Sequence, residues 1–367
     1  MKNLKSFVNV SRSLPAFVVL VSFSGAARAQ WTAIDLHPGG AAASVGSGGI
    51  GSQEAGYITV GSLYHAGLWN SSAASFVDLN SAGATQSLAT SAFNGKQSGY
   101  SNFGSLYHAS LWSGSAASFV DLNPTGFSES YSLALNSTQQ AGYSISVLTG
   151  SSHAGLWSGS SASWVDLHPA GIANSYIYGM SGGQEAGFTR TGNNHAAMWT
   201  GTAASYVDLH PGVASTSYAF GCGDGLQVGY ALVGGTNVAS LWSGTAASWT
   251  NLNPVGATES IMYSESYGQE AGYATIGGST HAGTWHGTAA SWVDLSTFLP
   301  SGFSSSVAQH IWSDATTTYV DGYGLFTASG TNHALLWTMP NPVPEPASFV
   351  ALGLGALALF RRKRKSP

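Results

Sequence analysis

A five-residue element, H-A-x-L-W, recurs seven times at nearly constant spacing and constrains the fold of this chain more than any other feature. Successive copies begin 42 to 52 residues apart, a Gly–aromatic step precedes each copy, and a V-D-L-like segment follows each of the first six. A repeat of this length is a supersecondary unit that buries its apolar face by stacking on its neighbours. The copies begin at His65, His108, His153, His195, Val238, His281 and His333.

The seventh V-D-L-like segment is displaced to the start of the chain, where residues 33–36 read A-I-D-L. A linear solenoid would leave unpaired strand edges at both ends. In a ring, the N-terminal strand completes the last repeat, and 42–45 residues hold the four short strands of a propeller blade. We therefore predict an all-β fold, a seven-bladed β-propeller over residues 30–339 closed by the N-terminal strand. The alternative is a right-handed β-helix, in which a displaced strand has no purpose.

Composition agrees with strands rather than helices. The chain has 48 Gly and only 7% charged residues, a mixture typical of strands joined by tight turns. Its 12 Trp, 16 Tyr and 15 Phe can fill a large core. Cys222 is the sole cysteine, so a disulfide within the chain is excluded.

Each repeated His lies 13 residues before an Asp, which predicts a hairpin that places the two on one face. The repeat that has Val238 instead of His also has Asn251 instead of Asp, so both members change together. We infer that the two residues touch in each blade. The predicted pairs are His65–Asp78, His108–Asp121, His153–Asp166, His195–Asp208, His281–Asp294 and, through ring closure, His333–Asp35.

Three uses for these pairs stay open. A buried carboxylate needs a donor, and six near-identical pairs around a ring are typical of a structural bond, which we favour. A catalytic base would need a third member, and no repeat supplies a distinctive one. If the V-D-L strands lined the channel, their carboxylates could bind calcium, although two ligands per blade do not form a zinc site. We expect no metal or other cofactor.

Two rows of aromatic residues accompany the repeats. The Trp that ends each H-A-x-L-W element is expected in the core between sheets. The second row lies two residues before the Asp position and varies in type. Its members Trp164, Trp249 and Trp292 are candidates for stacking on sugar rings.

Other positions are less regular. Six repeats carry Glu or Gln before an Ala-Gly or equivalent step, which indicates a hydrogen-bonding role that accepts a neutral side chain rather than catalysis. Residues that break the pattern are candidates for a unique site. They are Lys96, Arg190, Cys222, Asp224, His286, His310, Trp312 and Asp314.

The N-terminus reads as a secretory signal peptide over residues 1–29. Basic residues precede an apolar stretch, and Ala27 and Ala29 form an A-x-A cleavage site for signal peptidase. The alternative is a short membrane anchor, for which the apolar stretch is about half the length that a spanning helix needs.

The C-terminal residues 340–367 combine a Pro-rich motif, an apolar segment at 347–360 and a basic tail at 361–365. This order resembles the PEP-CTERM sorting signal of Gram-negative bacteria. The resemblance implies a short transient inner-membrane helix, cleavage by an exosortase, and export to the cell surface or an exopolysaccharide matrix. An ordinary tail anchor is the alternative. The residues that carry the resemblance are Pro344, Glu345, Pro346, Arg361, Arg362 and Arg364.

The repeats themselves resemble HAF-type extracellular repeats, although this chain replaces most His-Ala-Phe steps with His-Ala-Gly. Without its two ends the body keeps only Lys96 and Arg190 against 15 of the 16 acidic residues, a formal charge of −13. A body this acidic lacks the basic surface that nucleic acid requires. We expect a non-enzymatic surface or matrix protein that binds exopolysaccharide or surface proteins. The alternatives are a polysaccharide-active glycosidase or lyase and an inert structural coat protein.

Overall fold

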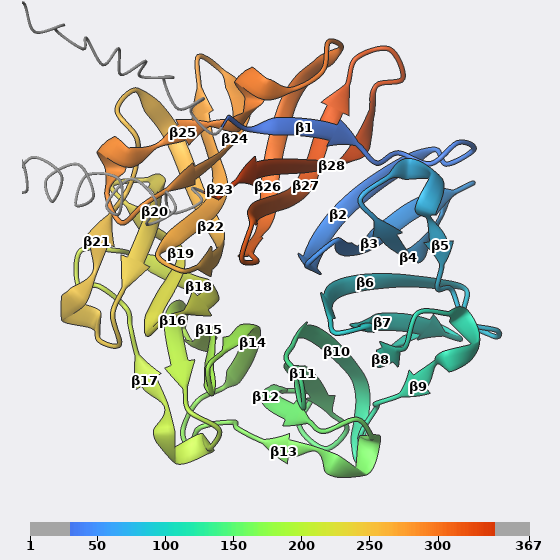
Figure 1. The fold of residues 1–367 in the computed structure, drawn as a ribbon. Coiled ribbons are helices and arrows are strands. Elements are labelled where there is room, and N and C mark those ends of the chain that lie inside the picture. The colour runs from blue at the N-terminus through green and yellow to red at the C-terminus, as the bar shows by residue number, and fades with distance from the viewer. Residues whose placement is uncertain (1–29, 342–367) are drawn as a thin grey trace, which may run out of the picture.

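In the computed structural model, which describes residues 30–341, the chain forms seven four-stranded antiparallel sheets arranged as the blades of a ring. Figure 1 shows the blades arranged around a common axis, with the first strand of each innermost. These first strands contact the first strands of the two neighbouring blades. The prediction of a seven-bladed propeller is confirmed. The predicted signal peptide, C-terminal helix and basic tail lie outside the described residues.

The strands follow the repeats. The inner strands are β2 (Ala43–Ile50), β6 (Gln86–Phe93), β10 (Phe127–Leu135), β14 (Asn174–Ser181), β18 (Thr216–Gly223), β22 (Ala257–Ser266) and β26 (Phe303–Ser313). The second strands, which carry the Gly–aromatic step, are β3 (Gln53–Val60), β7 (Lys96–Phe103), β11 (Gln140–Ser146), β15 (Gln184–Thr191), β19 (Leu226–Val233), β23 (Gln269–Ile276) and β27 (Thr317–Phe326).

The H-A-x-L-W elements form the third strands, β4 (Leu63–Asn70), β8 (Leu106–Trp112), β12 (Ser152–Trp157), β16 (Asn193–Trp199), β20 (Thr236–Trp242), β24 (Ser279–Trp285) and β28 (Thr331–Pro340). Short 3₁₀ helices follow six of these strands: η1 (Ala73–Ser75), η2 (Ala116–Ser118), η3 (Ser161–Ser163), η4 (Ala203–Ser205), η5 (Ala246–Ser248) and η6 (Ala289–Ser291). A seventh, η7 (Leu295–Phe298), follows β25.

The V-D-L segments are the outermost strands, β5 (Val77–Asp78), β9 (Val120–Asp121), β13 (Val165–Asp166), β17 (Val207–Asp208), β21 (Thr250–Asn251), β25 (Val293–Asp294) and β1 (Thr32–Asp35). β1 pairs with β28 and completes the seventh blade, as the displaced segment predicted. Because these strands lie at the rim, the hypothesis of a channel calcium site among their carboxylates is wrong.

The strand ends define two faces of the ring. The turns between first and second strands and helices η1–η6 lie on one face, which we call the 3₁₀ face. The turns between second and third strands and the links between blades lie on the other, which we call the linker face. Thr32 at the start of β1 pairs with Thr338 near the end of β28. The chain therefore enters and leaves the propeller on the 3₁₀ face of the seventh blade.

A fully buried serine in each inner strand bonds its blade to the preceding one. Its Oγ accepts a hydrogen bond of 2.8 to 3.1 Å from the backbone N–H of the Ala in the preceding H-A-x-L-W element. The bond from Ala334 to Ser44 joins the last blade to the first, so the same contact closes the ring. The serines are Ser44, Ser87, Ser130, Ser175, Ser217, Ser260 and Ser306.

The core lies between adjacent blades. The Trp at the end of each H-A-x-L-W element is at most 1% exposed, which confirms its predicted place. In three blades the second-row aromatic packs over the Gly that follows His-Ala: a Cβ on Gly67, Gly155 or Gly283 would lie 2.1 to 2.4 Å from the aromatic ring. This contact explains why His-Ala is followed by a small residue where an aromatic faces it. In the seventh blade Ala33 takes the aromatic position, and Leu335 follows His-Ala.

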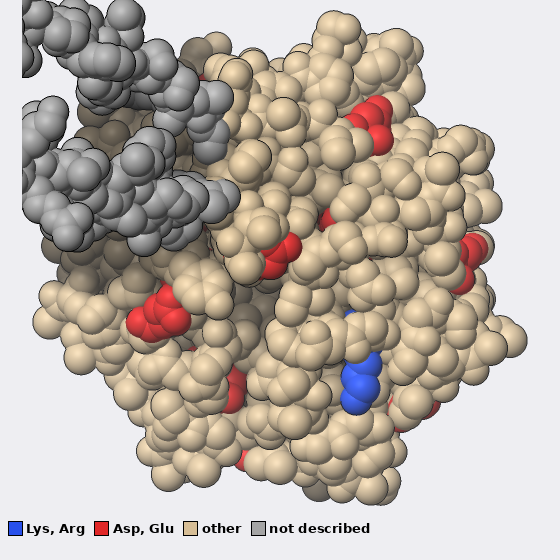
Figure 2. Space-filling view, in the orientation of Figure 1, with Lys and Arg blue, Asp and Glu red and all other residues tan. Residues whose placement is uncertain are grey.

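The surface carries few charges. Figure 2 shows acidic side chains scattered singly or in small groups over a mostly uncharged face. Within residues 30–341, no helix is long and apolar enough to cross a membrane.

Candidate ligand-binding channel

All six predicted His–Asp pairs are hydrogen bonded in the structure. The His Nδ1 to Asp Oδ2 distances are 2.7 to 2.9 Å. The connection between the His strand and the Asp strand contains a 3₁₀ helix rather than a tight turn. As a result, Asp78 pairs with Gly67 and meets His65 diagonally rather than directly across the hairpin.

The carboxylates of the pairs are 26 to 46% exposed, so the expectation of a buried carboxylate is wrong. The side chain of Asp166 is 42% exposed and that of His153 is 19% exposed, because both lie on the rim near the linker face. The Asp has a second role, since its Oδ1 accepts the backbone N–H two residues later in every blade. Asn251 keeps this bond to Asn253 at 2.8 Å although it faces Val238. The turn therefore needs a single side-chain oxygen, and the His contact is an addition to it.

The repeated Glu or Gln also supplies a side-chain oxygen that accepts a hydrogen bond from a turn. In six blades its side-chain oxygen accepts a backbone N–H from the turn after the third strand, at 2.8 to 3.0 Å. A carboxylate and an amide both supply that oxygen. Burial raises the pKa of Glu54 to about 7 and also raises those of Glu185 and Glu270.

Every inner strand carries a β-bulge at the same place. In β2 the register with β3 shifts between Gly46 and Gly48, and the other six inner strands shift at the equivalent step. A bulge leaves one residue unpaired and changes the direction of its side chain. We call the seven unpaired residues the bulge ring. They are Ser47, Thr90, Leu133, Tyr178, Phe220, Tyr263 and Gln309.

All seven residues of the bulge ring line a cavity of about 1000 Å³ in the channel on the side of the 3₁₀ face. They are half-buried, whereas most of their neighbours on the same strands are buried. Ser47, Thr90 and Gln309 also line a second cavity of about 310 Å³, which Tyr57, Tyr100, Tyr323 and Asn332 border toward the linker face. The two cavities therefore adjoin along the first, second and seventh blades.

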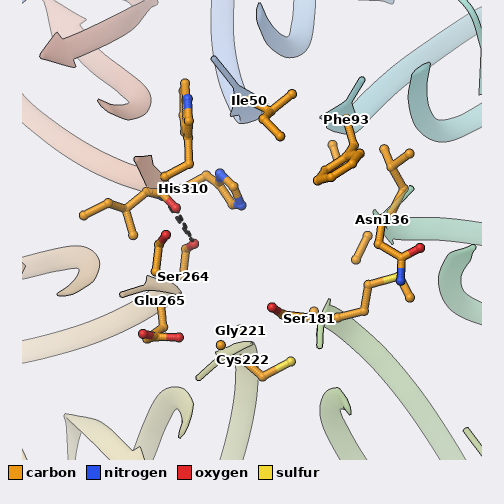
Figure 3. Close-up of a pocket in the computed structure, with 18 of the residues that line it drawn as sticks. Ile50, Phe93, Asn136, Ser181, Gly221, Cys222, Ser264, Glu265 and His310 are labelled. Carbon is orange, nitrogen blue, oxygen red and sulfur yellow. Dashed lines mark hydrogen bonds between the residues drawn. The ribbon is translucent and has the colours of Figure 1, made fainter. Parts of the chain in front are cut away.

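The layers on either side of the bulge ring are also uncharged. The layer toward the 3₁₀ face, several of whose members Figure 3 labels, is Ile50, Phe93, Asn136, Ser181, Gly223, Ser266 and Trp312. The layer toward the linker face is Val45, Leu88, Tyr131, Tyr176, Tyr218, Ile261 and Val307.

Some residues that break the repeat pattern meet at this cavity. Cys222, Asp224, His310 and Trp312 line it. Burial raises the pKa of Cys222 to about 12 and lowers that of His310 to about 4, so at neutral pH the thiol is protonated and the imidazole uncharged. Figure 3 shows His310 reaching toward the cavity from β26.

The remaining pattern-breaking residues do not join this site. Lys96 begins β7 and Arg190 lies on β15, at opposite faces of different blades. His286 and Asp314 lie in turns and do not line the cavity. Among residues 30–341, no group of three or more His, Cys, Asp or Glu side chains is placed to hold a metal ion.

Glu265 is a further carboxyl at the cavity, from β22. Figure 3 shows its side chain turned away from the centre. It occupies the space beside Gly223, where a Cβ would collide with its Oε2. Burial, with a smaller contribution from Asp224, raises the pKa of Glu265 to about 7.

The aromatics proposed for sugar stacking lie on the outer hairpins. Trp164 packs between Trp157, with ring centroids 4.5 Å apart, and Phe127, at 5.4 Å. Trp292 packs on Trp285 at 4.4 Å, and the indole N–H of Trp249 donates to Ser240. These rings are engaged by the blades that carry them, so they are weaker candidates for a sugar platform than the channel.

Sequence reasoning did not identify the bulge ring. Its members share no residue type, and the alternation of an ideal strand would have assigned them to a blade face. The sequence signal that could have identified these positions is their variation from blade to blade. It contrasts with the buried serine three residues earlier, which is constant in all seven blades.

Comparison with known proteins identifies the C-terminal end and the fold. Residues 342–365 match the PEP-CTERM protein-sorting motif, so the chain carries a signal for export and cell-surface association. No curated protein matches the chain.

Among solved structures, an S511A mutant of puromycin hydrolase in complex with PGG is similar with a TM-score of 0.54 and 12% identity, covering 86% of this chain and 58% of that one. A puromycin-hydrolyzing peptidase from Mycobacterium tuberculosis also gives 0.54, at 11% identity over 82% and 54%. The propeller domain of the Trilobed protease from Pyrococcus furiosus, described as having an open velcro topology, gives 0.50 at 10% identity over 81% and 94%. At this identity the likeness shows the fold alone.

Proposed function

We propose that this exported propeller protein is an exosortase substrate of the cell surface or extracellular matrix and acts there as a non-enzymatic binding module. The ligand that we propose is matrix polysaccharide, held in the central channel. The sorting motif supports the location, and the bulge ring supports the binding role.

The contrast between framework and channel carries this proposal. Serine, tryptophan and Glu or Gln recur at their framework positions because each makes the same contact in blade after blade. The bulge ring instead places side chains of six types around one cavity. A scaffold alone needs no such variation, whereas a binding site on a symmetric fold needs it to recognise an asymmetric ligand.

The test is binding by residues 30–341, which contain all seven sheets, to purified matrix polysaccharides in a pull-down assay. We expect saturable binding that Tyr178→Ala weakens, while Arg190→Ala at the edge of the fourth blade leaves it unchanged. The absence of binding to every polysaccharide would contradict the proposal and favour the inert coat protein.

One observation favours a second candidate, a polysaccharide-active enzyme. Asp224 and Glu265 both line the channel cavity, and the raised pKa of Glu265 suits a general acid. Under this alternative, the wild-type propeller should release reducing ends from a bound polysaccharide, and Glu265→Gln should abolish the release. Binding without release of reducing ends at any pH from 4 to 8 would exclude it.

A further inference from the structure

The bulge ring has two chemically different sides. In the fourth, fifth and sixth blades it presents Tyr178, Phe220 and Tyr263, which form a continuous wall with ring centroids 5.4 and 5.5 Å apart. In the seventh, first and second blades it presents Gln309, Ser47 and Thr90. An aromatic wall therefore lies across the channel from a wall of amide and hydroxyl groups.

Most polar groups of the ring are free to bind a ligand. Within residues 30–341, the hydroxyls of Ser47, Tyr178 and Tyr263 and the amide of Gln309 make no hydrogen bond to the protein, and none is sealed from solvent. Thr90 differs, because its hydroxyl donates to backbone carbonyls. Polar groups that stay accessible and unpaired in a concave site are the ones that orient a ligand.

Of the described residues, no Lys or Arg lines either cavity, and the only Asp or Glu residues among the lining residues are Asp224 and Glu265. The bulge ring and the two layers beside it contain no Asp, Glu, Lys or Arg. A carboxylate brought into this ring would lose water without meeting a cation. The surrounding body, with a formal charge of −13 over residues 30–343, adds long-range repulsion against a polyanion.

We propose that the channel binds a single strand of an uncharged glycan between these two walls and discriminates against uronate-rich polymers. Sugar rings have apolar C–H faces and hydroxyl edges, which match the aromatic and the polar wall respectively. This inference rests on the proposed binding function and specifies its ligand class and its site. The adjoining second cavity beside Tyr57, Tyr100 and Tyr323 extends the path toward the linker face.

The experiment is calorimetric titration of residues 30–341 with cellohexaose and laminarihexaose as neutral probes and hexagalacturonate as the charged probe of equal length. We expect a neutral hexasaccharide to bind at least tenfold more tightly than hexagalacturonate, with little dependence on salt between 50 and 300 mM. Tyr178→Ala and Gln309→Ala should each weaken binding about tenfold. Leu148→Ala, which changes an exposed residue in the turn between β11 and β12 that lines neither cavity, should have no effect.

A gain-of-function variant completes the test. Ser47→Lys places a cation in the polar wall and should raise the affinity for hexagalacturonate severalfold. Tighter binding of hexagalacturonate than of both neutral probes by the wild type would overturn the inference while leaving the binding function intact. Neutral binding that neither Tyr178→Ala nor Gln309→Ala reduces would place the site outside the channel and also overturn it. Failure of every matrix polysaccharide and hexasaccharide to bind would remove the proposed function itself.

Discussion

Replacing Glu54 by Gln should change how the stability of the propeller depends on pH. Glu54 is fully buried, and one of its oxygens accepts the backbone N–H of Ser71 at 2.9 Å. Burial raises its pKa from 4.5 to about 7 in the folded protein. The unfolded chain therefore loses the proton near pH 4.5 and the folded chain near pH 7, so the wild type loses stability as the pH rises between these values.

The size of the pKa shift of Glu54 determines how much stability the wild type loses. About 2.5 pKa units at about 1.4 kcal/mol each correspond to about 3 kcal/mol between pH 4 and pH 8. An amide carries no such dependence, and Gln occupies the equivalent place in three other blades. The amide has its own cost, because the Nε2 of Gln97 is buried without a partner. That cost does not depend on pH. The prediction therefore concerns how the difference in stability between Glu54→Gln and wild type changes with pH, rather than its value at one pH.

The assay is urea denaturation of wild type and Glu54→Gln at pH 4, 6 and 8. Relative to wild type, the variant should gain about 3 kcal/mol between pH 4 and pH 8. The reverse variant, Gln97→Glu, should lose stability over the same range. A stability difference that is flat with pH for both variants would refute the reasoning that burial keeps this carboxyl neutral.

Three further substitutions test the framework by thermal denaturation. Ser175→Ala should lower the free energy of unfolding by about 1 to 3 kcal/mol, because it leaves the N–H of Ala154 buried and unpaired. The control, Ser158→Ala, changes an exposed serine and should not change stability measurably. Equal effects of the two substitutions would contradict the inter-blade bond. Gly155→Ala should lower the free energy of unfolding by about 1 to 3 kcal/mol, because the new methyl group collides with Trp164. Adding Trp164→Leu should recover part of that stability. An unchanged melting temperature for Gly155→Ala would refute the contact. Asp166→Ala should lower the free energy of unfolding by about 1 kcal/mol. Asp166→Asn should lower it much less, because Asn keeps the oxygen that accepts the turn N–H of His168. An equal loss for both variants would show that the stability comes from the contact with His153 instead.

The architecture was predictable because the repeat is strict and one copy is displaced. The A-I-D-L segment before His37 allowed the closure of the ring to be inferred, and the paired change of Val238 and Asn251 indicated the His–Asp contact. The exposure of that pair was not predictable. Spacing fixes which strands are adjacent but not which strand faces the channel, and the V-D-L strand proved to be at the rim.

The candidate site was hidden from the sequence for a related reason. A β-bulge adds one residue to a strand, so Ser47, Tyr178 and their equivalents lie out of phase with the alternation that identifies buried and exposed faces. The residues that looked distinctive in the sequence, such as Cys222 and His310, do reach the cavity. Burial keeps both of them uncharged there at neutral pH.

The central claim is that the repeated residues build the ring and the bulge ring binds the ligand. The most direct test is a crystal structure of residues 30–341 grown with the hexasaccharide that binds most tightly. The account predicts sugar density in the channel, with rings against Tyr178, Phe220 and Tyr263 and hydroxyls facing Gln309 and Ser47. Sugar bound at the rim beside Trp249 or Trp292, with the channel filled only by water, would contradict it.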